Sequence, residues 1–242
     1  MSNFLVLGRG KTGSAVAQVV RQRGHDLQVV TSEDNHGGRA LTPGFLASID
    51  VVVDFTTPEA VVDNLRMLLP QGAKVVVGTT GWYAALPELA ALAEAHGASL
   101  LHGTNYSLGV QAFFRAAKQL AAALPGYALE IEETHHVTKK DVPSGTALTL
   151  QRIVQQAAGL AREQTAWQFA PESEAPITSH READAAGLHV LTLSSPEEVL
   201  TLRHEAFSRM GFANGAVRAA EWLVAREAPG VWDFADVATE LS

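Results

Sequence analysis

Phe4-Leu5-Val6-Leu7-Gly8-Arg9-Gly10-Lys11-Thr12-Gly13 is the stretch that decides the fold, because a short apolar run leads directly into three glycines spaced as G-x-G-x-x-G. A helical pattern over residues 14–23 follows. In this setting the first glycine makes a tight turn, the second lets the backbone approach a pyrophosphate, and the third lets the helix pack closely on the strand. The helix N-terminus adds N–H groups and a partial positive charge. The stretch predicts a dinucleotide-binding unit, with an ordinary glycine-rich turn as the alternative.

Four further apolar runs follow at regular intervals, and helical patterns lie between them. The runs cover residues 27–30, 51–55, 74–77 and 99–101. Continuous apolar strands that alternate with helices are typical of a parallel sheet buried on both faces. The first half of the chain is therefore predicted to be an α/β domain of the Rossmann type.

Two small, hydroxyl-rich segments lie after the third and fourth of these runs, where this fold places ligands. They are Gly78-Thr79-Thr80-Gly81 and Gly103-Thr104-Asn105-Tyr106-Ser107. Such residues allow close backbone approach and hydrogen bonds to a nicotinamide ribose or amide. They are also common turn formers, which is the alternative interpretation. Because both segments are in register with the glycine stretch, we expect them to bind the cofactor.

The choice between NADH and NADPH depends on the end of the second predicted strand. Glu33 lies about 20 residues after the glycines, where an acid binds the ribose hydroxyls of NAD. The hydroxyls of Thr31 and Ser32, with Arg9, Lys11 or Arg39 nearby, could instead accept the 2′-phosphate of NADP. Glu33 can equally be a solvated loop residue, so these residues leave both cofactors open.

The second half of the chain has a different pattern. A helix is predicted over residues 111–124, and side chains alternate through residues 127–136 as in a strand with two unlike faces. Two further runs, 188–193 and 199–206, flank a turn and predict a hairpin. This half is therefore expected to be an α+β domain with a mostly antiparallel sheet. The chain is then expected to close with a long helix over residues 212–226 and a short acidic helix over residues 231–241.

One segment concentrates two histidines, two lysines and a helix start: Glu133-Thr134-His135-His136-Val137-Thr138-Lys139-Lys140-Asp141-Val142-Pro143-Ser144-Gly145-Thr146-Ala147. Ser144 is a strong N-cap candidate, and Gly145 and Thr146 would then present N–H groups in the first turn, which is an anion site. The two lysines add positive charge. We expect a carboxylate-bearing substrate to bind here.

Histidine titrates nearest neutral pH, so His135 is the candidate to give or take a proton. The alternative is a histidine with a packing role beside a lysine pair on the surface. A metal site is a further alternative, with ligands from His135, His136, Glu132 and Glu133 and from His189 or His204. Adjacent histidines on a strand point to opposite faces, and H-E-x-x-H spacing does not occur, so no metal is expected.

Composition excludes several classes of protein. A chain of 242 residues with 47% hydrophobic residues is long and apolar enough for two folded domains. A net charge of -8 argues against nucleic acid as a partner. Apolar runs fall far below the ~20 residues of a membrane span, the N-terminus lacks a basic signal-peptide region, and zero cysteines exclude disulfides and thiolate sites. We expect a cytoplasmic protein that binds a small molecule and neither nucleic acid nor membrane.

Several of these motifs together resemble the 4-hydroxy-tetrahydrodipicolinate reductase (dihydrodipicolinate reductase) family of bacterial lysine biosynthesis. The resemblance rests on the glycine stretch, on Asp54-Phe55-Thr56 with Pro58-Glu59 and then Gly78-Thr79-Thr80-Gly81, on residues 133–147, and on Ser208-Arg209-Met210 with Phe212-Ala213-Asn214-Gly215-Ala216. It implies NAD(P)H-dependent reduction of dihydrodipicolinate to tetrahydrodipicolinate in lysine and diaminopimelate biosynthesis.

The resemblance also implies roles for single residues. His135 and Lys139 match the catalytic pair, which acts in proton donation, and His136, Gly145 and Thr146 match substrate-binding positions, to which the N-cap argument adds Ser144. The cofactor positions are Gly8, Arg9, Gly10, Lys11, Thr12, Gly13, Gly78, Thr79, Thr80, Gly103, Thr104, Asn105, Tyr106, Arg209 and Phe212, with Glu33 added from its spacing.

The expected domains are residues 1–107 with 210–242 for the dinucleotide, and residues 108–209 for substrate binding and, by resemblance, for assembly of a homotetramer through the sheets. Two rival hypotheses are a dinucleotide sensor without activity and another two-domain oxidoreductase, such as an aspartate dehydrogenase-like enzyme. A sensor has no need of the His135 and Lys139 pair. An aspartate dehydrogenase-like enzyme has no reason for the arrangement from His135 to Thr146.

Overall fold

A computed structural model describes residues 1–160, 175–183 and 185–241. The chain divides into two compact units, Met1–Leu108 with Arg209–Ser242, and Gly109–Ser208. Residues 161–174 and 184, which fall in the second domain expected from the sequence, and residue 242 lie outside the described residues. Within the described part, no helix is both long enough and apolar enough to cross a membrane.

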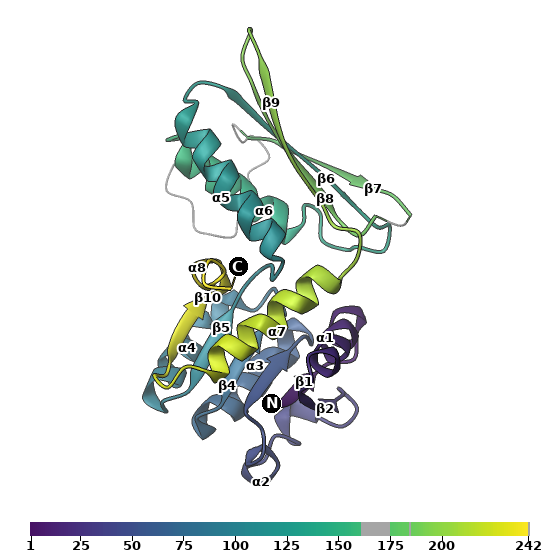
Figure 1. The fold of residues 1–242 in the computed structure, drawn as a ribbon, viewed down its shortest axis with the longest axis vertical. Coiled ribbons are helices and arrows are strands. Elements are labelled where there is room, and N and C mark those ends of the chain that lie inside the picture. The colour runs from purple at the N-terminus through teal and green to yellow at the C-terminus, as the bar shows by residue number, and fades with distance from the viewer. Residues whose placement is uncertain (161–174, 184, 242) are drawn as a thin grey trace. The chain divides into compact units, whose positions relative to one another are not determined.

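The first unit is built on a six-stranded sheet in the order β10-β5-β4-β3-β1-β2, and all neighbouring strands are parallel (Figure 1). The predicted Rossmann-type sheet is thus confirmed, and its first five strands lie within one residue of the predicted runs. The strands are β1 (Asn3–Leu7), β2 (Asp26–Val30), β3 (Val51–Asp54), β4 (Lys74–Val77), β5 (Ser99–His102) and β10 (Gly230–Asp233).

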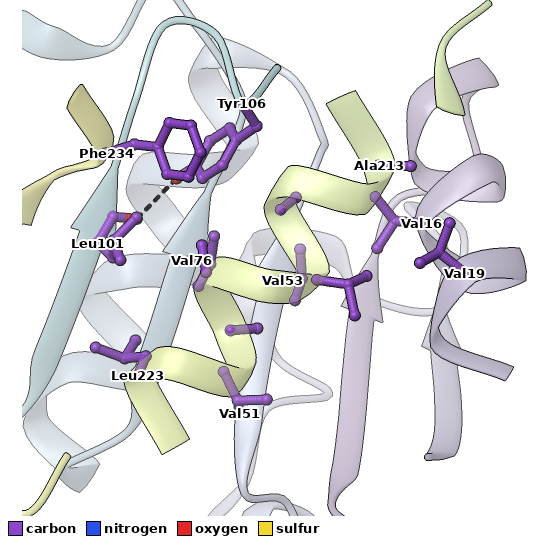
Figure 2. Packing of buried hydrophobic residues seen from close by; sticks show 14 of the residues in the cluster. Val16, Val19, Val51, Val53, Val76, Leu101, Tyr106, Ala213, Leu223 and Phe234 are labelled. Carbon is purple, nitrogen blue, oxygen red and sulfur yellow. Dashed lines mark hydrogen bonds between the residues drawn. The ribbon is translucent and has the colours of Figure 1, made fainter. Parts of the chain in front are cut away.

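Helices cover both faces of this sheet because successive strand residues point to opposite sides. Phe4 and Val6 of β1 pack in one cluster with residues of α1 and α7, part of which Figure 2 shows. Leu5 and Leu7 pack in a second cluster with residues of α3 and α4. The helices of this unit are α1 (Lys11–Gln22), α2 (Pro43–Leu46), α3 (Pro58–Leu68), α4 (Leu86–Ala95), α7 (Met210–Val224) and α8 (Phe234–Val237), with short 3-10 turns at His36–Gly38, Leu69–Gln71 and Tyr83–Ala85.

The end of the chain corrects one prediction. The sequence predicts a helix over residues 231–241, but β10 occupies the start of that segment and α8 is only one turn long. Val231 and Trp232 pair with Leu100 and Leu101 of β5, so their backbone is satisfied by a distant part of the chain. β-branched and aromatic side chains suit such an edge strand, and the Asp233 side chain then caps α8.

The second unit has a four-stranded sheet in the order β7-β6-β8-β9. Strand β6 (Ala128–His135) is antiparallel to β8 (Leu188–Ser194), which forms the predicted hairpin with β9 (Val199–Glu205). Strand β7 (Ile177–Arg181) is parallel to β6. The predicted mostly antiparallel sheet is confirmed. Helix α6 (Gly145–Ala157) belongs to this unit, and α5 (Leu108–Ala123) begins at its boundary.

The buried face of β6 changes from apolar to polar along the strand. Leu129 and Ile131 are buried in a cluster with residues of β8, α5 and α6. Glu133 and His135 continue the same face and are also buried, although they are polar. Because a buried carboxylate and imidazole require partners, the end of β6 is where this unit places polar chemistry.

Candidate active site

Three glycines shape the turn between β1 and α1. Gly8 has a φ of +98°, and a Cβ there would collide with the carbonyl group of Phe55. Gly13 lies against the Gly8 carbonyl, which brings helix and turn into backbone contact. A Cβ on Gly10, the residue that precedes α1, would meet no heavy atom of the described residues within 4 Å. The start of α1 is therefore open to a phosphate.

A pocket of about 440 Å³ lies over the ends of β1, β2 and β3. It is lined by parts of three loops, residues 8–10, 31–33 and 55–57, and so includes Arg9 and Glu33, both exposed. The sheet order reverses between β1 and β3, and open α/β sheets bind ligands at such a switch point. This pocket is the candidate nucleotide site, and Lys11 and Thr12 form the first turn of α1 beside the glycines.

The loop after β2 carries a second acid. The Thr31 hydroxyl donates to Asp34 Oδ2 at 2.7 Å, and Asp34 lines a further pocket of about 410 Å³ that includes Gly8 and Arg9. The distance from the glycines points to Glu33 and does not reveal Asp34. Of the two acids, Glu33 lines the larger pocket.

The two threonines of the segment after β4 differ in burial. Thr79 is buried, accepts a hydrogen bond from the Thr56 amide at 2.8 Å and lies 3.1 Å from Asp54 Oδ1. Thr80 is exposed. Gly78 packs directly on the Phe55 ring, where a Cβ would overlap it. Thr79 thus ties the ends of β3 and β4 together, while Thr80 faces solvent.

The segment after β5 places its tyrosine in the core. Tyr106 Oη lies 2.9 Å from the Val77 carbonyl and 3.1 Å from the Leu101 carbonyl, and its ring lies 4.5 Å from that of Phe234 (Figure 2). Burial raises the pKa of Tyr106 well above its ordinary value. The phenol therefore holds strand ends in place, and Gly103 and Thr104 with the buried Asn105 complete the loop.

The two predicted cofactor residues from the C-terminal part of the chain lie at the start of α7. Arg209 is the N-cap residue and Phe212 is in the first turn, and both are half-buried. They belong to the same compact unit as the glycine turn.

In the second unit, Glu133 is the centre of a buried cluster. Its carboxylate accepts the Ser144 amide at 3.0 and 3.1 Å and the Ser179 hydroxyl at 2.8 Å. His135 Nδ1 lies 3.3 Å from Oε2, and Arg181 Nη1 lies 3.6 Å from Oε1. The sequence pointed to His135 and Ser144 as site residues and to Glu133 only as one of several possible metal ligands, and it gave no signal for Ser179. The available signal was the alternation along β6, which puts an acid on the buried face two residues before the histidine.

The charges in this cluster follow from its contacts. Burial by itself raises the pKa of Glu133, but hydrogen bonds from His135, Ser144 and Ser179 and the charge on His135 lower it to about 2. Burial and, after it, the charge on His135 lower the pKa of His189 to about 3. Glu133 is therefore ionised and His189 neutral at neutral pH.

The start of α6 forms the candidate anion site. Ser144 is its N-cap, and the Ser144 hydroxyl accepts the Ala147 amide at 3.2 Å. A Cβ on Gly145 would meet nothing within 4 Å among the residues that the structure describes. The first turn of α6, with Gly145 and Thr146, can thus be approached by an anion.

The loop between β6 and α6 holds the remaining predicted residues. Lys139 Nζ donates to Asp141 Oδ2 at 2.8 Å, and His136 Nδ1 lies 2.7 Å from the Thr138 hydroxyl. Lys139 is half-buried, whereas Lys140 is exposed. Of the two lysines, Lys139 is the one that the fold holds in a defined place.

The cluster also contains side chains of the types that bind metals. One ligand atom from each of Glu133, His135 and His189 lies within 4.8 Å of the others. Both oxygens of Glu133 already accept hydrogen bonds, from Ser144 and Ser179. In the described structure the carboxylate is thus engaged by protein donors.

Family models match almost the whole chain. The model described as "Dihydrodipicolinate reductase, N-terminus" matches residues 3–106, and the model described as "Dihydrodipicolinate reductase, C-terminus" matches residues 109–238. The chain belongs to the dihydrodipicolinate reductase family. The boundary between the two matches falls where the structure divides into its compact units.

Similar proteins of the family extend over the full length. The 4-hydroxy-tetrahydrodipicolinate reductase of Christiangramia forsetii is 34% identical, over 99% of this chain and 98% of that protein. The enzyme of the same name from Natronomonas pharaonis is 37% identical, over 97% of this chain and 99% of that protein.

Solved structures show the same fold. A dipicolinate-bound dihydrodipicolinate reductase from Paenisporosarcina sp. TG-14 matches with a TM-score of 0.74 at 22% identity, covering 98% of this chain and 100% of that one. An aspartate dehydrogenase from Thermotoga maritima matches with a TM-score of 0.51 at 12% identity, covering 95% of this chain and 100% of that one. These likenesses concern the fold, which dihydrodipicolinate reductases share with other dehydrogenases.

Proposed function

We propose that this chain reduces 4-hydroxy-tetrahydrodipicolinate to tetrahydrodipicolinate with NADH or NADPH, a step of lysine and diaminopimelate biosynthesis. Family membership makes the chain an oxidoreductase that uses a nicotinamide cofactor. One observation carries the residue roles: His135 and the start of α6 share the carboxylate of Glu133. The reaction needs a proton donor and a site for the carboxylates of the substrate, and this cluster offers a proton donor beside a site for one carboxylate.

The first unit, which includes residues 209–242, is proposed to hold the cofactor. The open N-terminus of α1 at Gly10 suits the pyrophosphate, and the pocket lined by Arg9 and Glu33 suits the adenosine ribose. Thr80, Gly103 and the start of α7 are proposed for the nicotinamide side. When bound, the cofactor supplies the hydride.

The second unit is proposed to bind the substrate. The start of α6 can accept a carboxylate through backbone N–H groups, and Lys139 adds a positive charge. His136 is proposed for a further substrate contact. The Paenisporosarcina enzyme holds dipicolinate, a dicarboxylate, which supports this class of ligand.

His135 is proposed as the proton donor, with Lys139 as its catalytic partner. Loss of the 4-hydroxyl group as water gives a conjugated imine. The reduction then adds a hydride to the carbon that carried the hydroxyl and a proton to the neighbouring carbon, which becomes electron-rich as the hydride adds. An imidazole next to a buried carboxylate is held in one orientation and can supply that proton.

We further propose that the protein is a homotetramer of the cytoplasm. One face of the second sheet carries exposed side chains, among them Glu130, Glu132 and Arg203, and such a face is available for contact with another copy. Light scattering on purified protein is expected to give four times the mass of one chain. A monomer at assay concentration would contradict the proposed assembly.

A coupled assay tests the reaction. Dihydrodipicolinate synthase generates the unstable substrate, and loss of NADH or NADPH absorbance reports turnover. We expect turnover with at least one cofactor, a kcat about 10²-fold lower or more for His135→Gln, and mainly a higher substrate KM for Thr146→Val. Turnover with neither cofactor would overturn the proposal, and the reverse pattern in the variants would reassign the two residues.

A further inference from the structure

The carboxylate of Glu133 is enclosed by groups from four segments of the second unit. It is fully buried on β6 and contacts His135 on the same strand, Ser179 and Arg181 on β7, and the Ser144 amide at the start of α6. His189 on β8 adds its Nε2 at 3.8 Å. A buried carboxylate without such partners would destabilise the fold strongly, so its presence at this point calls for a reason.

We propose that Glu133 is a positioning residue that fixes both the ring of His135 and the first turn of α6, so that proton donor and substrate carboxylate meet in one geometry. This inference rests on the proposed function and deepens it. Membership of the family indicates the reaction, whereas the contacts of Glu133 indicate how the His135 ring and the first turn of α6 are held together.

The contact with Glu133 orients the ring of His135. Oε2 of Glu133 lies 3.3 Å from Nδ1, so the carboxylate favours a proton on that nitrogen and turns Nε2 away from it. A Cβ on Gly187 would lie 3.3 Å from Nε2, and glycine at this position leaves that space open. Nε2 is thus the nitrogen that can face a ligand.

Glu133 also anchors the start of α6. Both Glu133 oxygens lie within 3.1 Å of the Ser144 amide, and the Ser144 hydroxyl in turn accepts the Ala147 amide. The cap of the helix is therefore anchored to the strand that carries His135. A negative charge at a helix N-terminus also stabilises the helix.

Several titratable groups surround the His135 ring and affect its protonation. His135 has Glu133 beside it on β6 and His189 against its ring from β8. Arg181 is the register partner of His135 on β7, and the amide of Glu182, the next residue, donates to the His135 carbonyl. Lys139, paired with Asp141, and His204 of β9 act on His189 from further away. Among the described residues, Glu133 supplies the one carboxylate within 4 Å of the His135 ring. The loss of a negative charge next to an imidazole disfavours its protonated form.

The test compares Glu133→Gln with Glu94→Gln, the same substitution at an exposed position of α4 in the first unit. For Glu133→Gln we expect a kcat about 100-fold lower, a substrate KM raised several-fold, and an alkaline limb of the pH–rate profile that moves to lower pH. Glu94→Gln and the wild type should agree in all three. Equal profiles for the two variants, in a wild type that turns over, would overturn the inference.

A second measurement needs no variant. ¹⁵N NMR of histidine-labelled wild-type protein reports which ring nitrogen of His135 carries the proton, and we expect Nδ1–H at neutral pH. Nδ1 without a proton would overturn the inference even if Glu133→Gln fails to fold. NADH affinity and thermal unfolding of each variant show whether the fold is intact. A wild type without turnover would instead count against the proposed function.

Discussion

Asn64 donates a hydrogen bond to Asp54 inside the first unit, with 2.7 Å between Nδ2 and Oδ2, and both side chains are buried. Oδ1 of Asp54 accepts the amide and the hydroxyl of Thr56 and lies near the Thr79 hydroxyl. Burial raises the pKa of Asp54, and hydrogen bonds from Thr56, Asn64 and Thr79 oppose this. These bonds join the ends of β3 and β4 to α3 next to the candidate nucleotide pocket.

Asp54→Ala is expected to lower the free energy of unfolding by about 3 kcal/mol or more, because several buried donors lose their acceptor. Urea denaturation measures this loss, and isothermal titration should show weaker NADH or NADPH binding. Asp63→Ala, at an exposed position of the same helix as Asn64, serves as the control and should change stability by about 0.5 kcal/mol at most. Equal losses in both variants would contradict a structural role of this network.

Gly10→Ala and Gly13→Ala are expected to fail in different ways. At Gly13 a Cβ would strike the Gly8 carbonyl, so the protein should lose stability. At Gly10 a methyl group meets open space in the described structure and the backbone conformation allows alanine, so stability should hold while cofactor affinity falls about 10-fold or more. Thermal unfolding and cofactor titration separate the two effects. Unchanged affinity in Gly10→Ala would mean that the phosphate does not lie at this turn.

Gly187→Ala is expected to lower kcat through His135. The new methyl group would lie 3.3 Å from Nε2, and a φ of +152° strains any other residue. Gly126→Ala is the matched control, since its φ of +91° gives similar strain while its Cβ meets no described atom within 4 Å. Both variants should be less stable, but only Gly187→Ala should lose turnover beyond that of the control.

Glu133 should make stability depend on pH in the acid range. Its pKa is about 2 in the folded chain against an ordinary 4.5, so its contribution is complete above 4.5 and disappears as the pH falls through 2. Relative to Glu133→Gln, the wild type should therefore lose on the order of 3 kcal/mol across this window. Urea denaturation at several pH values within it measures the difference. A constant difference would show that folding does not lower the pKa of this carboxylate.

Much of the fold follows from local sequence. The run from Phe4 to Gly13 specifies a strand, a tight turn and a helix because each step depends on neighbouring residues only. The alternation after residue 127 likewise predicts β6, and the N-cap at Ser144 predicts the start of α6. By contrast, the helix predicted over residues 231–241 is wrong, because β10 forms through its pairing with β5, which no local pattern reveals.

The same division holds for the candidate site. The sequence by itself determined the family, the dinucleotide fold and the choice of His135, Lys139 and the start of α6, since these rest on residue types at short spacing. Only the tertiary structure decided that Tyr106 and Thr79 turn inward and that Glu133 joins His135 to Ser144. The physical reason is that burial and hydrogen-bond partners come from strands and helices far apart in the chain, and they determine whether a polar side chain binds a ligand or holds the fold.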